Sequence, residues 1–79
     1  MFSISQRIIL QNMKDELDMG TDDEGILRIL ANVDSRILFG ADPDDATFCT
    51  LLASTIKHAR PSIGKRVDAY FVTRGARAP

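Results

Sequence analysis

Residues 42–61 read DPDDATFCTLLASTIKHARP, and this stretch decides the fold because it holds a complete helix with its start and stop signals. Asp42 is a favoured N-cap, Pro43 suits the first helical position, and two more acids follow where the helix dipole favours negative charge. Pro61 ends the helix because the residue before a proline is pushed out of the helical region. We therefore predict a helix over 43–59. The residues at helical spacing are Phe48, Leu51, Leu52, Thr55, Ile56 and Ala59.

Two helices are predicted before this one, over about 3–18 and 22–38. Ser3-x-x-Gln6 fits a capping box, and Gly20 stands where the first helix should end. A second capping box is expected between Thr21 and Glu24, and Gly40 should close the second helix. The expected core stripes are Ile9, Met13 and Leu17 in the first helix, and Ile26, Leu30, Val33 and Ile37 in the second.

A fourth helix is predicted over about 62–74, starting at Pro61 or Ser62 and stopping near Gly75. Its inward side chains are expected to be Ile63, Val67, Tyr70 and Phe71. No strand is predicted, and the connections between the four helices are short. We expect one domain over 1–79, an all-α compact four-helix fold whose C-terminal half is helix-turn-helix-like.

Composition narrows the class of protein. A chain of 79 residues that is 44% hydrophobic and 27% charged is typical of one globular domain. No apolar run approaches the roughly 20 residues of a membrane span, and the start of the chain lacks the layout of a signal peptide. The single cysteine, Cys49, excludes an internal disulfide and fits a reducing compartment. These features predict a cytoplasmic protein that does not enter a membrane.

The net charge of −1 conceals an uneven distribution along the chain. Residues 1–46 hold ten of the eleven acids and four of the ten bases, a net charge of −6. Residues 47–79 hold one acid and six bases, a net charge of +5. Such asymmetry suggests a basic end that faces a polyanion, or a partner of complementary charge.

The segment LLASTIKHARPSIGKRVDAYFVTRGAR, residues 51–77, resembles the helix-turn-helix stretch of winged-helix transcription regulators of the MarR type. Leu52-Ala53 matches the pair in the first helix of that motif. Arg60-Pro61-Ser62 matches the entry to the recognition helix, residues 65–69 match its body, and Arg74-Gly75 matches its exit. The resemblance covers about a third of the chain and does not extend to the β-wing or the long dimerisation helices of that family. It implies DNA binding by a bare helix-turn-helix.

A recognition helix places its N-terminal side chains in the major groove while neighbouring cations hold phosphates. We therefore predict a small DNA-binding transcriptional or mobile-element regulator, with a homodimer as a plausible state. A two-fold dimer would present two recognition helices to a palindromic site. The candidate DNA-binding residues are Lys57, Arg60, Ser62, Lys65, Arg66 and Arg74.

The acidic residues of the N-terminal half leave an alternative function open. A protein of this size could act on a host or regulatory protein, as an anti-activator or as a phage anti-defence protein of the anti-CRISPR kind that presents acids in place of DNA. Capping and helix dipoles account for most of these acids equally well. The candidate protein-binding residues are Asp15, Asp18, Asp22, Asp23, Asp44 and Asp45.

Catalysis finds little support in the sequence, and we predict no enzyme, no cofactor, no metal and no small-molecule substrate. Cys49 and His58 are nine positions apart on one predicted helix, which places them on opposite faces and roughly 13 Å apart along its axis. A Cys–His nucleophile pair needs hydrogen-bond reach. One histidine and one cysteine also do not make a typical zinc site.

Overall fold

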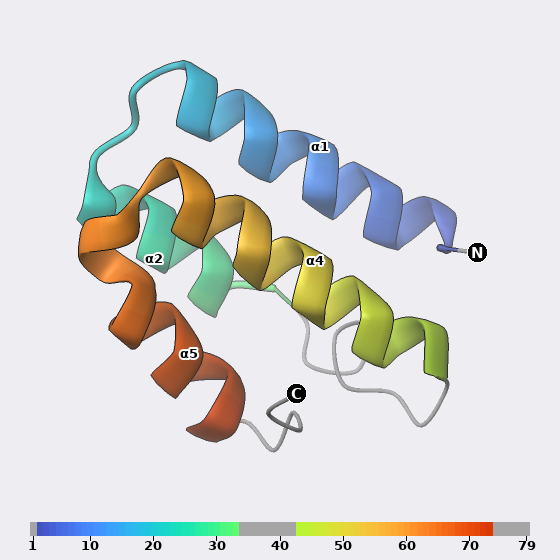
Figure 1. Cartoon of the computed structure of the whole chain (residues 1–79). Coiled ribbons are helices and arrows are strands. Elements are labelled where there is room, and N and C mark those ends of the chain that lie inside the picture. The colour runs from blue at the N-terminus through green and yellow to red at the C-terminus, as the bar shows by residue number, and fades with distance from the viewer. Residues whose placement is uncertain (1, 34–42, 74–79) are drawn as a thin grey trace.

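A computed structural model describes residues 2–33 and 43–73, apart from the side chains of residues 43, 44 and 73. Four α-helices and one 3-10 turn account for nearly all of this part of the chain, which contains no strand (Figure 1). The all-α four-helix fold is therefore confirmed. The elements are α1 (Ile4–Asp18), α2 (Asp23–Ala31), α4 (Pro43–Ala59), η1 (Pro61–Ile63) and α5 (Gly64–Thr73).

The helices alternate in direction along the chain. Figure 1 shows α1 and α4 side by side and running the same way, while α2 and α5 run back in the opposite direction. The helix α1 packs on α4 and α2, and α4 also packs on η1 and α5. As a consequence, α2 and α5 both begin at the end of the bundle where α1 and α4 finish.

The capping box of α1 is present as predicted. The Gln6 backbone N–H donates to Ser3 Oγ (3.1 Å), and the Ser3 N–H donates to Gln6 Oε1 (3.0 Å). The helix ends at Asp18 with Met19 as its C-cap, and the next residue, Gly20, has a φ of 82° in the left-handed region that glycine adopts without steric cost. The backbone N–H of Thr21 then donates to the Glu16 carbonyl (3.1 Å) and closes the helix end.

The second helix differs from its prediction at both ends. It stops at Ala31 with Asn32 as its C-cap, so the predicted extent of 22–38 was too long; residues 34–38, Ile37 among them, lie outside the described residues. The N-cap is Asp22, whose carboxylate accepts from the Gly25 N–H (2.8 Å). The predicted capping box between Thr21 and Glu24 was wrong, because the helix begins one residue later, with Asp22 as its N-cap and glycine at the third helical position. The Thr21 hydroxyl donates instead to Glu16 Oε1 (2.7 Å).

The C-terminal helices follow the prediction closely. The bounds of α4 match 43–59, although Asp42, its predicted N-cap, lies outside the described residues. Pro61 starts a 3-10 turn and not an α-helix, so α5 begins at Gly64. The described part of α5 ends at Thr73, and Arg74 lies outside it.

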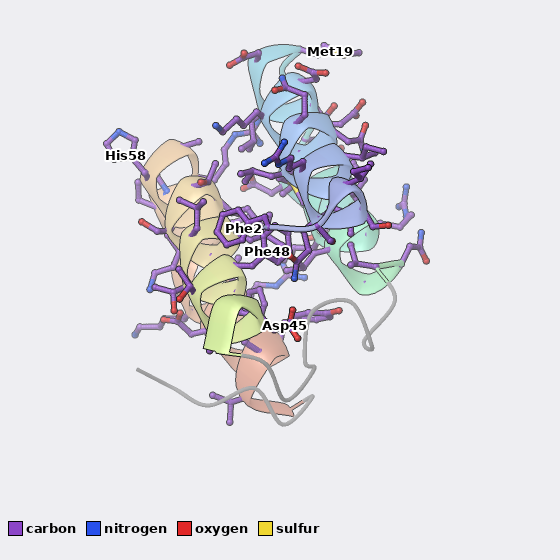
Figure 2. All side chains as sticks on the ribbon, turned by 90° about the vertical axis from the view of Figure 1, so that its right-hand side faces the viewer. Phe2, Met19, Asp45, Phe48 and His58 are labelled. Carbon is purple, nitrogen blue, oxygen red and sulfur yellow. The ribbon has the colours of Figure 1, made fainter. Side chains whose placement is uncertain are left out.

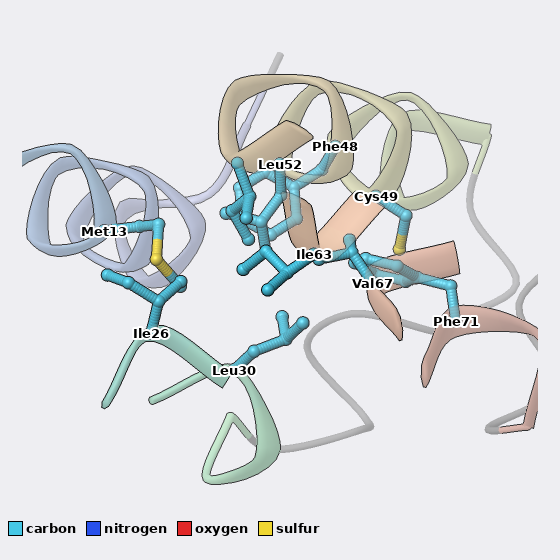
Figure 3. Packing of buried hydrophobic residues seen from close by; sticks show 10 residues of the cluster. Met13, Ile26, Leu30, Phe48, Cys49, Leu52, Ile63, Val67 and Phe71 are labelled. Atoms are coloured by element: carbon cyan, nitrogen blue, oxygen red, sulfur yellow. The ribbon is translucent and has the colours of Figure 1, made fainter. Parts of the chain in front are cut away.

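Every described α-helix contributes a fully buried side chain to one core cluster. Figure 3 shows Met13 of α1 pointing towards Ile26 of α2, and Cys49 of α4 near Val67 and Phe71 of α5. The predicted stripes are largely confirmed; the exceptions are Leu51 and Ala59, which are exposed. The fully buried residues are Met13, Ile26, Leu30, Phe48, Leu52, Ile56 and Val67.

One buried polar side chain links α1 to α4 beside this core. Gln6 is buried, and its Nε2 donates to Asp45 Oδ1 (2.6 Å) in the first turn of α4. Next to this contact the ring of Phe2 meets Phe48 edge-on, with centroids 5.4 Å apart, and Figure 2 shows the two rings between the helices. Gln6, which completes the capping box of α1, therefore also ties α1 to the first turn of α4.

Replacing Gln6 by alanine should destabilise the fold by about 1–3 kcal/mol, because the change removes half of the capping box and leaves Asp45 without this donor. Chemical denaturation followed by circular dichroism measures this loss. Gln11→Ala is the matched control, since Gln11 is exposed and bonds only to Asp15 on its own helix. Equal losses in the two variants would contradict a linking role for Gln6.

Candidate nucleic-acid interface

Within the described residues, the predicted DNA-binding side chains lie around a tight turn between α4 and α5. The Arg60 N–H donates to the Ile56 carbonyl (2.8 Å), and the Ile63 N–H donates back to the Arg60 carbonyl (3.1 Å). Ile63 is buried in the core, which fixes the turn. Lys57, Arg60, Ser62 and Arg66 are thereby brought to one end of the bundle.

The first turn of α2 lies against this turn, because α2 and α5 begin at the same end of the bundle. Its N-cap, Asp22, is followed by Asp23 and Glu24, both in the first helical turn. The Arg60 Nη1 lies 2.9 Å from Asp23 Oδ1, and the Ser62 hydroxyl donates to the second oxygen of the same carboxylate (3.1 Å). The Arg60 side chain is only 20% exposed, so this contact is largely shielded from water.

Arg66 holds the neighbouring carboxylate with two hydrogen bonds. Its Nη1 donates to Glu24 Oε2 (2.6 Å) and its Nη2 donates to Glu24 Oε1 (3.2 Å). The hydrogen bonds and the charge of Arg66 hold the pKa of Glu24 below its ordinary value. Both side chains are more than half exposed, so water weakens their attraction. We call the contacts of Asp23 and Glu24 with Arg60, Ser62 and Arg66 the α2–α5 clamp.

The remaining predicted DNA-binding residues divide into three cases. The Lys57 ammonium binds Asp68 of α5, at 2.9 and 3.2 Å from its two oxygens. Lys65 is exposed and has no ion pair among the described residues. Arg74 lies outside them. Three of the predicted cations are thus balanced by carboxylates of the same chain.

The acidic residues of the rival prediction are not brought together as one surface. Asp15 accepts from Gln11 Nε2 (2.9 Å), and Asp18 is exposed in the last turn of α1. Asp22 caps α2, Asp23 belongs to the clamp, and Asp45 accepts from Gln6. The side chain of Asp44 lies outside the described residues. Most of these carboxylates therefore have structural partners.

The two side chains considered for catalysis lie in different environments, one buried and the other exposed. Cys49 is buried, and desolvation, with a smaller contribution from Asp45, raises the pKa of its thiol to about 11. His58 is exposed in the last turn of α4, at the opposite end of the helix from Asp45 (Figure 2). Within residues 2–33 and 43–73, no three His, Cys, Asp or Glu side chains group closely enough to hold a metal ion.

The outer face of α4 is a feature that the sequence reasoning missed. A shallow hollow there is lined by uncharged side chains, among them Leu51, which is 39% exposed. The Thr50 hydroxyl donates to the Ala46 carbonyl of its own helix (3.1 Å). The available signal was the uncharged run 46–56. The lining residues are Ala46, Thr47, Thr50, Leu51 and Ser54.

None of the helices in the described part of the chain combines the length and the apolar character that crossing a membrane requires. Comparison of the chain with protein-family models, with curated proteins and with solved structures found no match.

Gly25→Ala should destabilise the protein although alanine is the better helix former. A Cβ atom at this position would lie 2.6 Å from Thr21 Cγ2 and 2.9 Å from the capping oxygen of Asp22. Both neighbours are held by hydrogen bonds, so the methyl group displaces the cap, at a cost of about 1 kcal/mol. Thermal unfolding measures the effect.

Gly64→Ala provides the contrast, because a Cβ there would meet only the Lys57 side chain at 3.7 Å. This variant should gain up to about 1 kcal/mol. A stabilising Gly25→Ala would show that the cap of α2 is looser than its geometry indicates.

In an NMR titration, the Glu24 carboxyl should show a pKa below its ordinary value, and Arg66→Gln should return that pKa towards normal. A carboxyl whose pKa is lowered by folding adds stability at neutral pH, and this stability is lost as the pH falls through the lowered pKa. Arg7→Gln, at an exposed position of α1, should leave the Glu24 pKa unchanged. An identical Glu24 titration in Arg66→Gln would contradict the two hydrogen bonds.

Proposed function

We propose that this chain is a small non-enzymatic regulator that binds DNA through the α4–η1–α5 unit. The observation that carries the proposal is the gathering of Lys57, Arg60, Ser62 and Arg66 at one end of the bundle, where all four already donate to carboxylate oxygens. Phosphate presents oxygens of the same kind, and the arginine fork recognises carboxylate and phosphate alike.

The short connection between α4 and α5 supports the same reading. In a helix-turn-helix, the second helix places the side chains of its first turns in the major groove. On this assignment α5 is the recognition helix, Lys65 is exposed in its first turn, and Ser62 is exposed in η1 just before it. Arg60 and Lys57 hold phosphates on either side of the turn, and Arg74, which lies outside the described residues, stays a candidate from the sequence. A two-fold dimer would pair two such units with a palindromic site.

A second function has one observation in its favour. The ion pairs of Lys57, Arg60 and Arg66 reduce the positive charge that DNA would meet. A regulator with a balanced surface is suited to a protein partner, and this chain would then act as an anti-activator or as an anti-defence protein. Its acidic candidates are scattered over α1, α2 and α4, which is why we place DNA binding first.

Fluorescence anisotropy with a labelled duplex of mixed sequence tests the proposal. The protein should bind at low salt, with an affinity that falls steeply as salt rises because counterions are released from the phosphates. The double variant Lys65→Glu/Arg66→Glu should lose at least about tenfold in affinity, since it removes two cations from the proposed interface and adds repulsion.

The matched control is Arg7→Glu/Lys14→Glu, which makes the same change in net charge at two exposed positions of α1. This control should bind DNA nearly as well as the unaltered protein. Equal losses of DNA affinity in both double variants would show that the effect comes from net charge and not from the positions of Lys65 and Arg66. Absence of binding at low salt, together with a partner protein that survives nuclease treatment in affinity capture, would favour the second function.

A further inference from the structure

The α2–α5 clamp occupies the same side chains that the proposed function assigns to DNA. Arg60 and Ser62 share the carboxylate of Asp23, and Arg66 binds both oxygens of Glu24. We infer that the first turn of α2 is an autoinhibitory anion, which occupies the DNA-binding surface and must release Arg60 and Arg66 before they contact phosphate. This inference rests on the proposed function.

The location of the clamp explains why negatively charged groups are favoured at this place. The starts of α2 and α5 lie together, and the N-terminus of a helix carries a partial positive charge. Two such ends next to Arg60 and Arg66 make a surface that attracts negative charge. Asp23 and Glu24 supply that charge from within the chain, at a high effective concentration that any external anion must overcome.

The clamp is exchangeable because its contacts are open to water. The side chains of Arg66 and Glu24 are 57% and 63% exposed, and exposed ion pairs hold their partners weakly. DNA neutralises many charges at once, so it competes well with two isolated carboxylates. Arg60 is more enclosed than Arg66, and its release from Asp23 is the harder step.

Release does not require α2 to leave the bundle. Ile26 and Leu30 of α2 are fully buried in the core, and Asp22 caps the helix independently of the clamp. Rotation of the Asp23 and Glu24 side chains is therefore enough to free the two guanidinium groups. It also follows that neutralising both carboxylates should leave the fold intact.

The double variant Asp23→Asn/Glu24→Gln tests this inference, because both amides keep the size of the side chain and remove its charge. With the mixed-sequence duplex at about 50 mM salt, it should bind about tenfold more tightly than the unaltered protein, because DNA no longer has to displace two carboxylates from Arg60 and Arg66. The slope of log affinity against log salt should stay close to that of the unaltered protein, because both form the same phosphate contacts once bound.

Asp15→Asn/Asp18→Asn is the matched control. It makes the same change in net charge at two exposed positions of α1 that do not contact the clamp. This control should gain less than about threefold in affinity, with an unchanged salt slope. Glu24→Gln alone, at an exposed side chain, should show an intermediate gain, and circular dichroism verifies that each variant is folded.

Equal gains in the two double variants would overturn the autoinhibitory role while leaving DNA binding in place. Binding by the Asp23→Asn/Glu24→Gln variant alone, with none by the unaltered protein, would support the inference in its strongest form. Failure of every folded variant to bind DNA would remove the proposed function and this inference together.

Discussion

The fold depends on one face of α4, where Phe48, Leu52 and Ile56 are fully removed from water. Met13, Ile26 and Val67 bring the other described α-helices to the same cluster. A core of this size leaves little freedom in how four short helices are placed, because each must direct its single apolar stripe inwards. The alternating directions of the helices then bring the starts of α2 and α5 together. The position of the charged side chains follows from this hydrophobic constraint.

The charge asymmetry of the chain has a different meaning in three dimensions. Along the sequence, the acids of the N-terminal half and the bases of the C-terminal half look like two separate surfaces for two different partners. In the fold, Asp23 and Glu24 contact Arg60 and Arg66, so part of the asymmetry is satisfied within the molecule. A side chain that caps or pairs inside the chain is not for that reason excluded from function, since exposed pairs exchange readily.

Local signals predicted the helices well wherever the deciding residues are neighbours in the sequence. Ser3 and Gln6 cap α1, Gly20 closes it, and Pro43 and Pro61 mark the ends of α4's segment, all through contacts within a few residues. The prediction failed at α2, where Asp22 and not Thr21 is the N-cap and where the apolar pattern continues beyond the end of the helix at Ala31. Periodicity marks apolar positions but does not by itself locate a helix end.

The sequence by itself determined that this protein is all-helical, which side chains of each helix face inwards, and that its C-terminal half carries the basic residues. These properties depend on spacing and capping over a few positions, and such short-range interactions can be recognised from the sequence alone. Only the tertiary structure decided that Asp23 holds Arg60 and Ser62, and that Glu24 holds Arg66, across 37 to 42 positions of the chain. Pairs so distant are chosen by how the helices pack, because many carboxylates and many cations satisfy one another equally well until the core fixes which of them meet.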